Sequence, residues 1–269
     1  MLWAVLVIIL ICLIYLFLIK PGKHRSESSF FAKQKYAHRG LHDNQNGIPE
    51  NSLLSFKRAM EKGYGVELDV QLTADKISVV FHDETLLRLC GDGRKVRELT
   101  YNELNQLRLL DTDEAVPMFT EVLDMLGQTP ILCEIKTYPN NNLEVCKVVA
   151  DTIKKYNCRL CIESFNPLAV RYFKQNMAEV IRGQLSMDFI KNRSGLSRVT
   201  AFLLKNLLFN FYTKPDFIAF KHTNYKCFSF ALCRKLFKLP CFAWTITSPA
   251  EEEKAMKDFN TVIFENYIS

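Results

Sequence analysis

Apolar residues follow two different patterns along the chain. The first is a single run, Leu2–Ile19, which contains eighteen residues and no charge. As a helix, such a run rises about 1.5 Å per residue and extends over roughly 27 Å. That length is close to the hydrocarbon thickness of a bilayer, about 30 Å. The run therefore predicts one membrane-spanning helix.

The residues that flank this run distinguish an anchor from a cleaved signal peptide. A signal peptide has a basic segment before a shorter apolar core and a small-residue cleavage site after it. Here no basic residue precedes the run, no Ala-x-Ala follows it, and the basic segment 20–25 ends it. The pattern favours an uncleaved, single-pass anchor. The positive-inside rule then places the rest of the chain in the cytoplasm.

The second pattern alternates short apolar runs, typical of strands, with longer amphipathic stretches, typical of helices. Strands are predicted near residues 35–38, 66–70, 77–81, 131–135, 159–164, 179–185, 216–220, 240–246 and 261–264. Helices are predicted near residues 51–62, 142–156, 166–176, 196–212, 226–237 and 249–257, and residues 84–129 predict irregular structure with short helices. Strands that alternate with helices indicate a parallel α/β architecture.

Size and charge agree with one globular domain behind the anchor. About 250 residues follow the apolar run, a common size for an α/β barrel. We therefore expect an anchor over residues 1–20, a juxtamembrane linker over 21–33 and one barrel over 34–269. The net charge of +6 is modest. Without an arginine-rich arm or a nucleic-acid motif, it predicts no nucleic-acid partner, and a basic surface beside anionic lipid accounts for it.

Polar residues suited to chemistry lie where the early strands end. In an α/β barrel the active site forms at these ends. Alternate residues of a strand point to the same face, so residues two apart can point together into the barrel mouth. The clusters are His38 with Arg39, Glu67 with Asp69, His82 with Asp83, and Glu134 with Lys136.

Glu67, Asp69 and Glu134 predict a metal site. Two carboxylates held close together raise one pKa unless a cation lies between them. Glu134, from a neighbouring strand, adds a third hard oxygen ligand, and this set suits Mg²⁺ or Ca²⁺ with water completing the shell. Zinc is disfavoured, because neither thiolates nor several imidazoles are placed there.

Several segments resemble one known family in the same order along the chain. They are 36–40 (Tyr-Ala-His-Arg-Gly), 49–52 (Pro-Glu-Asn-Ser), 65–75 (Gly-Val-Glu-Leu-Asp-Val-Gln-Leu-Thr-Ala-Asp), 79–83 (Val-Val-Phe-His-Asp), 88–91, 116–123 and 132–136. With the later landmarks Ser164-Phe165 and Trp244-Thr245, the chain resembles the glycerophosphodiester phosphodiesterase family over about residues 35–263. The resemblance is specific early in this range and weaker after it.

The resemblance implies a TIM-type (β/α)8 barrel with a small insertion at roughly residues 84–129, after the early strands. It implies metal-dependent hydrolysis of a glycerophosphodiester to glycerol 3-phosphate and an alcohol. Position by position, it implies metal ligands Glu67, Asp69 and Glu134, acid/base residues His38 and His82, and phosphate-contacting Arg39 and Lys136. Glu50, in the metal-side loop, and Trp244 are candidates for the substrate pocket.

The end of the chain departs from the family's pattern. The family often ends its barrel with Asp-Gly and Thr-Asp, whereas this sequence has Asn260-Thr261 and Phe264-Glu265-Asn266. The resemblance therefore does not define what the last strand adds to the pocket. Trp244, near the end of the eighth strand, is suited either to stacking on a glycerol moiety or to core packing.

Two alternative functions stay open. The anchor would hold the barrel mouth near lipid, which favours lysophospholipase D-type hydrolysis of membrane lysophospholipids. Residues 196–211 are also more apolar than a solvated helix requires, and they form either core or a lipid-facing lid. The other alternative is a non-catalytic, membrane-tethered binding barrel. A lost ligand or histidine would indicate it, and none of the candidate positions is lost.

Overall fold

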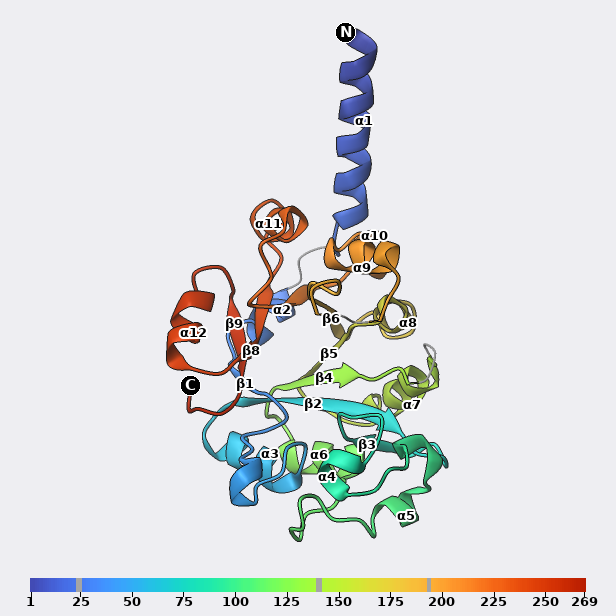
Figure 1. Cartoon of the computed structure of the whole chain (residues 1–269), viewed down its shortest axis with the longest axis vertical. Coiled ribbons are helices and arrows are strands. Elements are labelled where there is room, and N and C mark those ends of the chain that lie inside the picture. The colour runs from blue at the N-terminus through green and yellow to red at the C-terminus, as the bar shows by residue number, and fades with distance from the viewer. Residues whose placement is uncertain (23–25, 139–141, 193–194) are drawn as a thin grey trace.

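A long helix projects from a rounded domain (Figure 1). The computed structural model describes residues 1–22, 26–138, 142–192 and 195–269. Residues 23–25, part of the basic segment, therefore lie outside the described residues. The projecting helix is α1 (Leu2–Ile19). It is the one described helix long and apolar enough to cross a membrane, and 6% of the span is buried. It is a candidate membrane span or signal sequence.

Eight parallel strands close into a barrel. Their order around the ring is β1, β2, β4, β5, β6, β7, β8 and β9, and β1 pairs with both β2 and β9. Their bounds are β1 (Tyr36–Ala37), β2 (Gly65–Leu72), β4 (Ile131–Ile135), β5 (Leu160–Ser164), β6 (Ile181–Ser186), β7 (Phe217–Lys221), β8 (Cys241–Ile246) and β9 (Thr261–Phe264). The predicted TIM-type barrel is confirmed.

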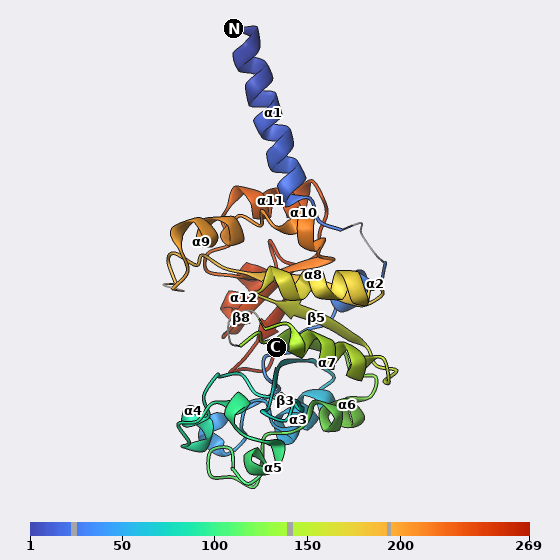
Figure 2. The same cartoon turned by 90° about the vertical axis from the view of Figure 1, so that its right-hand side faces the viewer.

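Helices lie around the barrel and in the loops at its ends (Figures 1 and 2). They are α2 (Ser26–Phe31), α3 (Leu53–Glu61), α4 (Leu87–Cys90), α5 (Tyr101–Leu104), α6 (Phe119–Leu126), α7 (Glu144–Ile153), α8 (Pro167–Asn176), α9 (Arg198–Lys205), α10 (Asn210–Thr213), α11 (Phe228–Lys235) and α12 (Pro249–Ala255). Local sequence sets where several begin. Ser52, for example, caps α3 by accepting a hydrogen bond from the Ser55 amide, as N-cap serines do.

The segment predicted as a linker, residues 21–33, contains helix α2. Phe31 of this helix is buried against the apolar cluster inside the barrel. Its carbonyl accepts a hydrogen bond from the Tyr36 hydroxyl at 3.0 Å. The Arg159 guanidinium lies 4.9 Å from the centroid of the Phe30 ring. The polar composition of the segment concealed these aromatic contacts, which attach part of it to the barrel.

The predicted strand near 77–81 is not a barrel strand. The structure has β3 (Ser78–Val80), which pairs antiparallel with the end of β2, with Val80 opposite Val70. The expectation that this run joins the parallel set is therefore wrong. Apolar pattern does not distinguish the two directions of pairing. The insertion consequently begins at β3, earlier than the predicted residue 84.

The insertion has its own apolar cluster, which includes Phe81, Leu86, Leu89 and Leu104, all buried. The short helices α4 and α5 contribute to it, as the irregular pattern of 84–129 predicted. This cluster keeps the segment after β3 packed over one side of the barrel mouth.

Alternation along the strands separates an inner and an outer apolar layer. On β7, Ile218 and Phe220 belong to the cluster shared with the helices, whereas Phe217 and Ala219 belong to the cluster inside the barrel. The rings of Phe217 and Phe242 stack inside with centroids 4.4 Å apart. Because apolar side chains fill the interior, polar groups are confined to the ends of the barrel.

The run 196–212, predicted as one helix, forms α9 and α10. Leu207 separates them with a φ of 56°, a left-handed conformation that a continuous helix does not tolerate. Helix α10 packs on the end of α1: Asn210 Nδ2 donates to the Ile19 carbonyl at 3.1 Å. The rings of Phe211 and Phe17 lie 5.4 Å apart. The base of α1 is therefore attached to the domain.

Gly183 of β6 gives a test of core packing. A Cβ at this position would overlap the ring of Phe217, which is fully buried and stacked on Phe242. We expect Gly183→Ala to lower the free energy of unfolding by about 1–3 kcal/mol, as overpacking does, measured by urea titration. Gly93→Ala is the control, because nothing lies within 4 Å of its position. Equal stability of the two variants would contradict the packing.

Candidate active site

Four carboxyl side chains meet at the carboxyl-terminal end of the barrel. Glu67 and Asp69 are two residues apart on β2, and strand register places Asp69 beside Glu134 of β4 and Glu134 beside Glu163 of β5. All are buried. Glu67, Asp69 and Glu134 each offer an oxygen, and these oxygens lie within 4.8 Å of one another. The three predicted metal ligands are brought together, and Glu163 joins them.

Two cations, the buried Lys136 and the partly buried Arg39, face these carboxylates. Lys136 Nζ lies 2.9 Å from Asp69 Oδ1 and 2.8 Å from Glu134 Oε1. Arg39 Nε lies 3.4 Å from Asp69 Oδ2, and the Arg39 backbone amide donates to Glu67 Oε2 at 3.0 Å. The two residues predicted to contact phosphate thus pair with the predicted metal ligands.

Burial and charge move the carboxyl pKa values in opposite directions. Burial, followed by repulsion from Asp69 and Glu134, raises the pKa of Glu67 well above its ordinary value. Burial also raises the pKa of Glu163, and the like charges of Glu67 and Glu134 add to it. For Asp69, burial opposes ionisation, but the charge of Lys136 and other nearby cations lowers the pKa. Asp69 is therefore the carboxyl group of this cluster that ionises most readily.

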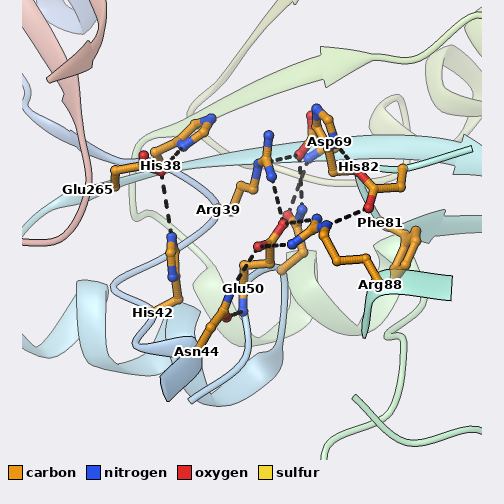
Figure 3. Close-up of polar contacts among 12 residues, drawn as sticks. His38, Arg39, His42, Asn44, Glu50, Asp69, Phe81, His82, Arg88 and Glu265 are labelled. Atoms are coloured by element: carbon orange, nitrogen blue, oxygen red, sulfur yellow. Dashed lines mark hydrogen bonds and ion pairs between the residues drawn. The ribbon is translucent and has the colours of Figure 1, made fainter. Parts of the chain in front are cut away.

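His38 follows β1 and is held by a carboxylate from the end of the barrel. Its Nδ1 lies 2.7 Å from Oε2 of Glu265, directly after β9. Glu265 Oε2 also lies 3.8 Å from His42 Nε2, between the two rings (Figure 3). Burial lowers the pKa of His38, although the hydrogen bond with Glu265 opposes it. The contact at Nδ1 leaves Nε2 for a ligand.

His82 is oriented in a similar way. Its Nδ1 lies 2.6 Å from Asp83 Oδ1, and Asp83 Oδ2 accepts a hydrogen bond from Arg88 Nε at 2.7 Å. Gln71 Nε2 donates to the carbonyls of Phe81 and Asp83 at 2.7 and 2.8 Å, which holds the backbone on both sides of His82. Both predicted histidines therefore carry a carboxylate on Nδ1.

Glu50 is buried behind Arg39 (Figure 3). Its carboxylate accepts a hydrogen bond from Arg39 Nη1 at 2.6 Å, and from Arg88 Nη1 and Nη2 at 2.7 and 2.8 Å. Asn44 Nδ2 donates at 2.9 Å. Burial opposes ionisation, but the hydrogen bonds from Arg88 and the charge of Arg39 lower the pKa of Glu50 to about 2. Its position suits the orientation of Arg39 more directly than contact with substrate.

A cavity of about 110 Å³ lies between the two histidines and the acidic residues of the barrel mouth. Both candidate histidines, Arg39 and Trp244 line it; Glu50 is not among the described lining residues. The Trp244 ring packs edge-on against Phe165 with centroids 5.4 Å apart. Its indole nitrogen is buried without a hydrogen-bond partner among the described residues. Trp244 therefore lies in the site and has a donor available for a ligand.

Two site residues, Glu163 and Glu265, were absent from the sequence prediction. The segment Cys161-Ile162-Glu163 repeats the order of Leu132-Cys133-Glu134, two apolar residues and then an acid, and this was the available signal. Glu265 lies in the segment that departs from the family pattern. Only closure of the barrel brings it next to His38, so no local signal indicated it.

The donors at the mouth fit a divalent cation. Glu67, Asp69 and Glu134 offer only carboxylate oxygens, the ligands that hard cations prefer. Glu163 lines the same cavity, and its Oε2 is buried with no hydrogen-bond partner in the described part of the chain. A positive ion at this point would offset the like charges that raise the pKa of Glu163.

Fold and site together define an α/β barrel. Its mouth carries a cluster of carboxylates suited to a cation and two histidines, each paired with a carboxylate. The family model of the glycerophosphoryl diester phosphodiesterase family matches residues 38–260. The chain belongs to this family.

Individual relatives agree with this assignment. A glycerophosphodiester phosphodiesterase from Caldanaerobacter subterraneus is 38% identical to this chain. The match covers 52% of the length of this chain and 60% of the length of that protein. A human protein named lysophospholipase D GDPD1 is 32% identical over 50% of this chain and 45% of its own. These matches thus span about half of either chain. An Oleispira antarctica phosphodiesterase, solved with sn-glycerol-3-phosphate, shares the fold: its TM-score is 0.71 at 23% identity, over 88% of this chain and 94% of that one.

The low pKa of Glu50 predicts a loss of stability in acid. Its pKa of about 2 in the folded chain lies below the ordinary 4.5. The ionised form therefore stabilises the fold above about pH 4.5, and this contribution, on the order of 3 kcal/mol, is lost as pH falls towards 2. We expect Glu50→Gln to be less stable than the wild type at pH 7. Its free energy of unfolding, measured by urea titration at each pH, should fall less steeply than that of the wild type as the pH is lowered from 4.5 towards 2.

A matched control for Glu50→Gln is Glu61→Gln on α3. Glu61 is exposed, and its carboxylate lies 4.0 Å from Lys57. The stability of this variant should follow the wild-type pH profile. A free energy of unfolding that falls as steeply in acid for Glu50→Gln as for the wild type would contradict the prediction.

Proposed function

We propose that this chain hydrolyses glycerophosphodiesters to glycerol 3-phosphate and an alcohol with the help of a divalent cation. One observation carries the proposal: a single cavity is lined by His38, His82, Arg39 and acidic residues suited to a cation. Family membership supports it, as does the solved relative that binds sn-glycerol-3-phosphate. The proposed substrate class is a glycerol-based phosphodiester, not a nucleic acid.

Glu67, Asp69 and Glu134 are the proposed metal ligands, with Mg²⁺ or Ca²⁺ as the cation. When bound, such a cation supplies Lewis-acid stabilisation of the phosphoryl oxygens. Glu163, in the same cavity, extends the acidic set. Each carboxylate comes from a barrel strand, so its backbone position is fixed by the strand ladder.

Arg39 and Lys136 are the proposed phosphate-binding residues. Arg39 is held by Glu50 at 2.6 Å and lines the cavity. Lys136 lies 2.9 Å from Asp69 at the same mouth. Two fixed positive charges beside the phosphate stabilise the additional negative charge of the transition state.

His38 and His82 are the proposed acid/base pair. One ring accepts a proton from the attacking hydroxyl, which belongs to water or to the substrate's own glycerol. Attack by the glycerol hydroxyl would give a cyclic phosphate, which water then opens to glycerol 3-phosphate. The other donates a proton to the leaving alkoxide as its P–O bond breaks. Glu265 and Asp83 hold the rings by Nδ1, so that Nε2 exchanges the proton in each case. The lowered pKa of His38 favours its neutral form, which can accept a proton.

We assign α1 to the membrane and the barrel to the cytoplasmic side. In this division, residues 1–20 are the anchor, 21–33 the juxtamembrane segment and 34–269 the catalytic domain. The eighteen apolar residues of this helix, with 6% of the span buried, support this assignment. The basic segment 20–25 supports the orientation through the positive-inside rule.

The two histidines give the first functional prediction. We expect His38→Ala and His82→Ala each to lower kcat by roughly 10²–10⁴-fold, the usual contribution of general acid/base catalysis. The assay measures release of glycerol 3-phosphate from glycerophosphocholine by the full chain in detergent. His222→Ala, after β7, should retain wild-type turnover. A rate close to wild type in either of the first two variants would contradict the two-histidine mechanism.

The acidic cluster gives a second prediction, which does not depend on turnover. A cation that binds the folded chain at 100 times its Kd should stabilise it by about 2.7 kcal/mol. We expect Mg²⁺ or Ca²⁺ to raise the melting temperature of the wild type, and a chelator to reverse the increase. Glu67→Gln/Glu134→Gln should show little increase, whereas exposed Glu144→Gln should respond as the wild type does. The same increase in all three proteins would place the cation elsewhere.

Hydrolysis of lysophospholipids is a second candidate function. It is supported by the human relative of that name and by a larger cavity of about 610 Å³ that adjoins the site. Glycerophosphocholine and lysophosphatidylcholine, assayed in parallel, separate the two functions. Turnover of the lysolipid alone would set aside the soluble diester as substrate.

A further inference from the structure

The larger cavity, about 610 Å³, shares part of its lining with the candidate active site. His82, Glu134 and Phe165 line both this cavity and the smaller one that holds His38. A ligand bound at the catalytic groups can therefore extend into the larger space. The volume lies within the range of about 300–1,000 Å³ that is typical of small-molecule pockets. None of the proposed catalytic steps requires such a volume.

The walls of the larger cavity divide into a polar end and an apolar end. Among the described residues that line it, the ionisable groups of the catalytic mouth are His82, Glu134 and Lys136. The remaining lining is largely apolar and aromatic, and it includes Leu168, Phe189, Leu196, Leu204 and Phe209. This division fits a molecule with a charged phosphodiester at one end and a hydrocarbon chain at the other.

The segment that forms one wall of the cavity also holds the base of α1. Phe209 and Tyr212 line the cavity at the two ends of a short segment. Between them, Asn210 Nδ2 donates to the Ile19 carbonyl at 3.1 Å. Close by, the Gly22 amide donates to the Pro215 carbonyl at 3.1 Å. The cavity wall and the end of the apolar helix therefore form one packed unit.

Exposed apolar side chains lie on the helices at this end of the domain. Val199 and Phe202 of α9 are 70% and 55% exposed, and Phe228 of α11 is 69% exposed. The Phe228 ring lies 6.0 Å from that of Tyr15 on α1. Figures 1 and 2 both place α9, α10 and α11 at the end of the domain from which α1 projects. These side chains extend the apolar surface of α1, so a bilayer that contains α1 would also cover them.

We infer that the larger cavity binds the hydrocarbon chain of a single-chain phosphodiester lipid, which enters from the bilayer beside α1. The phosphate of this lipid then lies between His38 and His82, and its chain lies along Leu168, Leu196 and Leu204. The inference rests on the proposed phosphodiesterase function and names its substrate class. The smaller cavity, about 110 Å³, accommodates a compact group on the other side of the phosphate.

Kinetics of cavity-filling variants test this inference. The full chain is placed in nanodiscs of diacyl phosphatidylcholine and assayed with lysophosphatidylcholine and with glycerophosphocholine, which has no chain. Thr200→Trp and Leu196→Trp add an indole at two separate points of the lining. We expect each to lower kcat/KM for the lysolipid roughly tenfold or more relative to that for glycerophosphocholine.

Gln175→Trp on α8 is the control, because Gln175 is exposed, does not line the cavity and lies outside the apolar surface beside α1. It should keep the wild-type ratio of the two substrates. A ratio that stays at the wild-type value in both Thr200→Trp and Leu196→Trp would overturn the inference. Thermal unfolding of each variant shows that a changed ratio does not come from a misfolded chain.

A binding measurement separates this inference from the proposed function. Lysophosphatidylcholine with a photoreactive group on its chain is cross-linked to the wild type in the presence of a chelator, and the labelled peptides are mapped by mass spectrometry. Labels on residues 165–168 and 196–212 that disappear in Thr200→Trp support the cavity even where no diester is hydrolysed. Labels confined to α1 overturn it, even where glycerophosphocholine is hydrolysed and the proposed function stands.

Discussion

Burial of like charge at the barrel mouth is the constraint on which the rest of the site depends. Strand register places Asp69, Glu134 and Glu163 side by side, with Glu67 two residues before Asp69 on the same strand. Buried carboxylates are costly unless opposite charge accompanies them. Lys136 neutralises part of this charge, and burial together with the remaining like charge raises the pKa values of Glu67, Glu134 and Glu163. A divalent cation held by these groups, as proposed, would displace their protons, so its affinity would increase with pH.

A series of charged contacts extends from this mouth into the insertion. Arg39 pairs with Glu50 at 2.6 Å, Glu50 with Arg88 at 2.7 Å, Arg88 with Asp83 at 2.7 Å, and Asp83 with His82 at 2.6 Å. Arg88 lies on α4, which the insertion's own apolar cluster holds in place. The insertion therefore connects the guanidinium proposed to bind phosphate with one of the two proposed acid/base rings, and its packing contributes to the geometry of both.

The spacing of apolar residues was sufficient to predict the barrel strands. The positions of Glu67, Asp69 and Glu134 at strand ends were sufficient to predict that they lie together, because parallel strands end at the same edge. They were not sufficient for β3, since an apolar run has the same pattern in parallel and antiparallel pairing. The contact between His38 and Glu265 joins residues 227 positions apart and exists only because β9 closes on β1. Glu163 is a single acid in an apolar strand, and only the register reveals its neighbour Glu134.

Phosphodiester chemistry and a hydrocarbon chain require opposite surroundings, and the two adjoining cavities provide them. The smaller gathers most of the charged groups, beside Phe165, Leu185, Trp244 and Ile263, whereas the larger becomes apolar beyond His82 and Lys136. The hydrogen bond from Asn210 to the Ile19 carbonyl holds the apolar wall of the larger cavity against the end of α1. If α1 lies in the membrane as proposed, this contact determines which of the two cavities is nearer to the bilayer. A freely jointed tether would leave the barrel mouth in any orientation. If α1 spans the membrane as proposed, the attached helix would hold the apolar cavity nearest the lipid and keep the charged mouth in water.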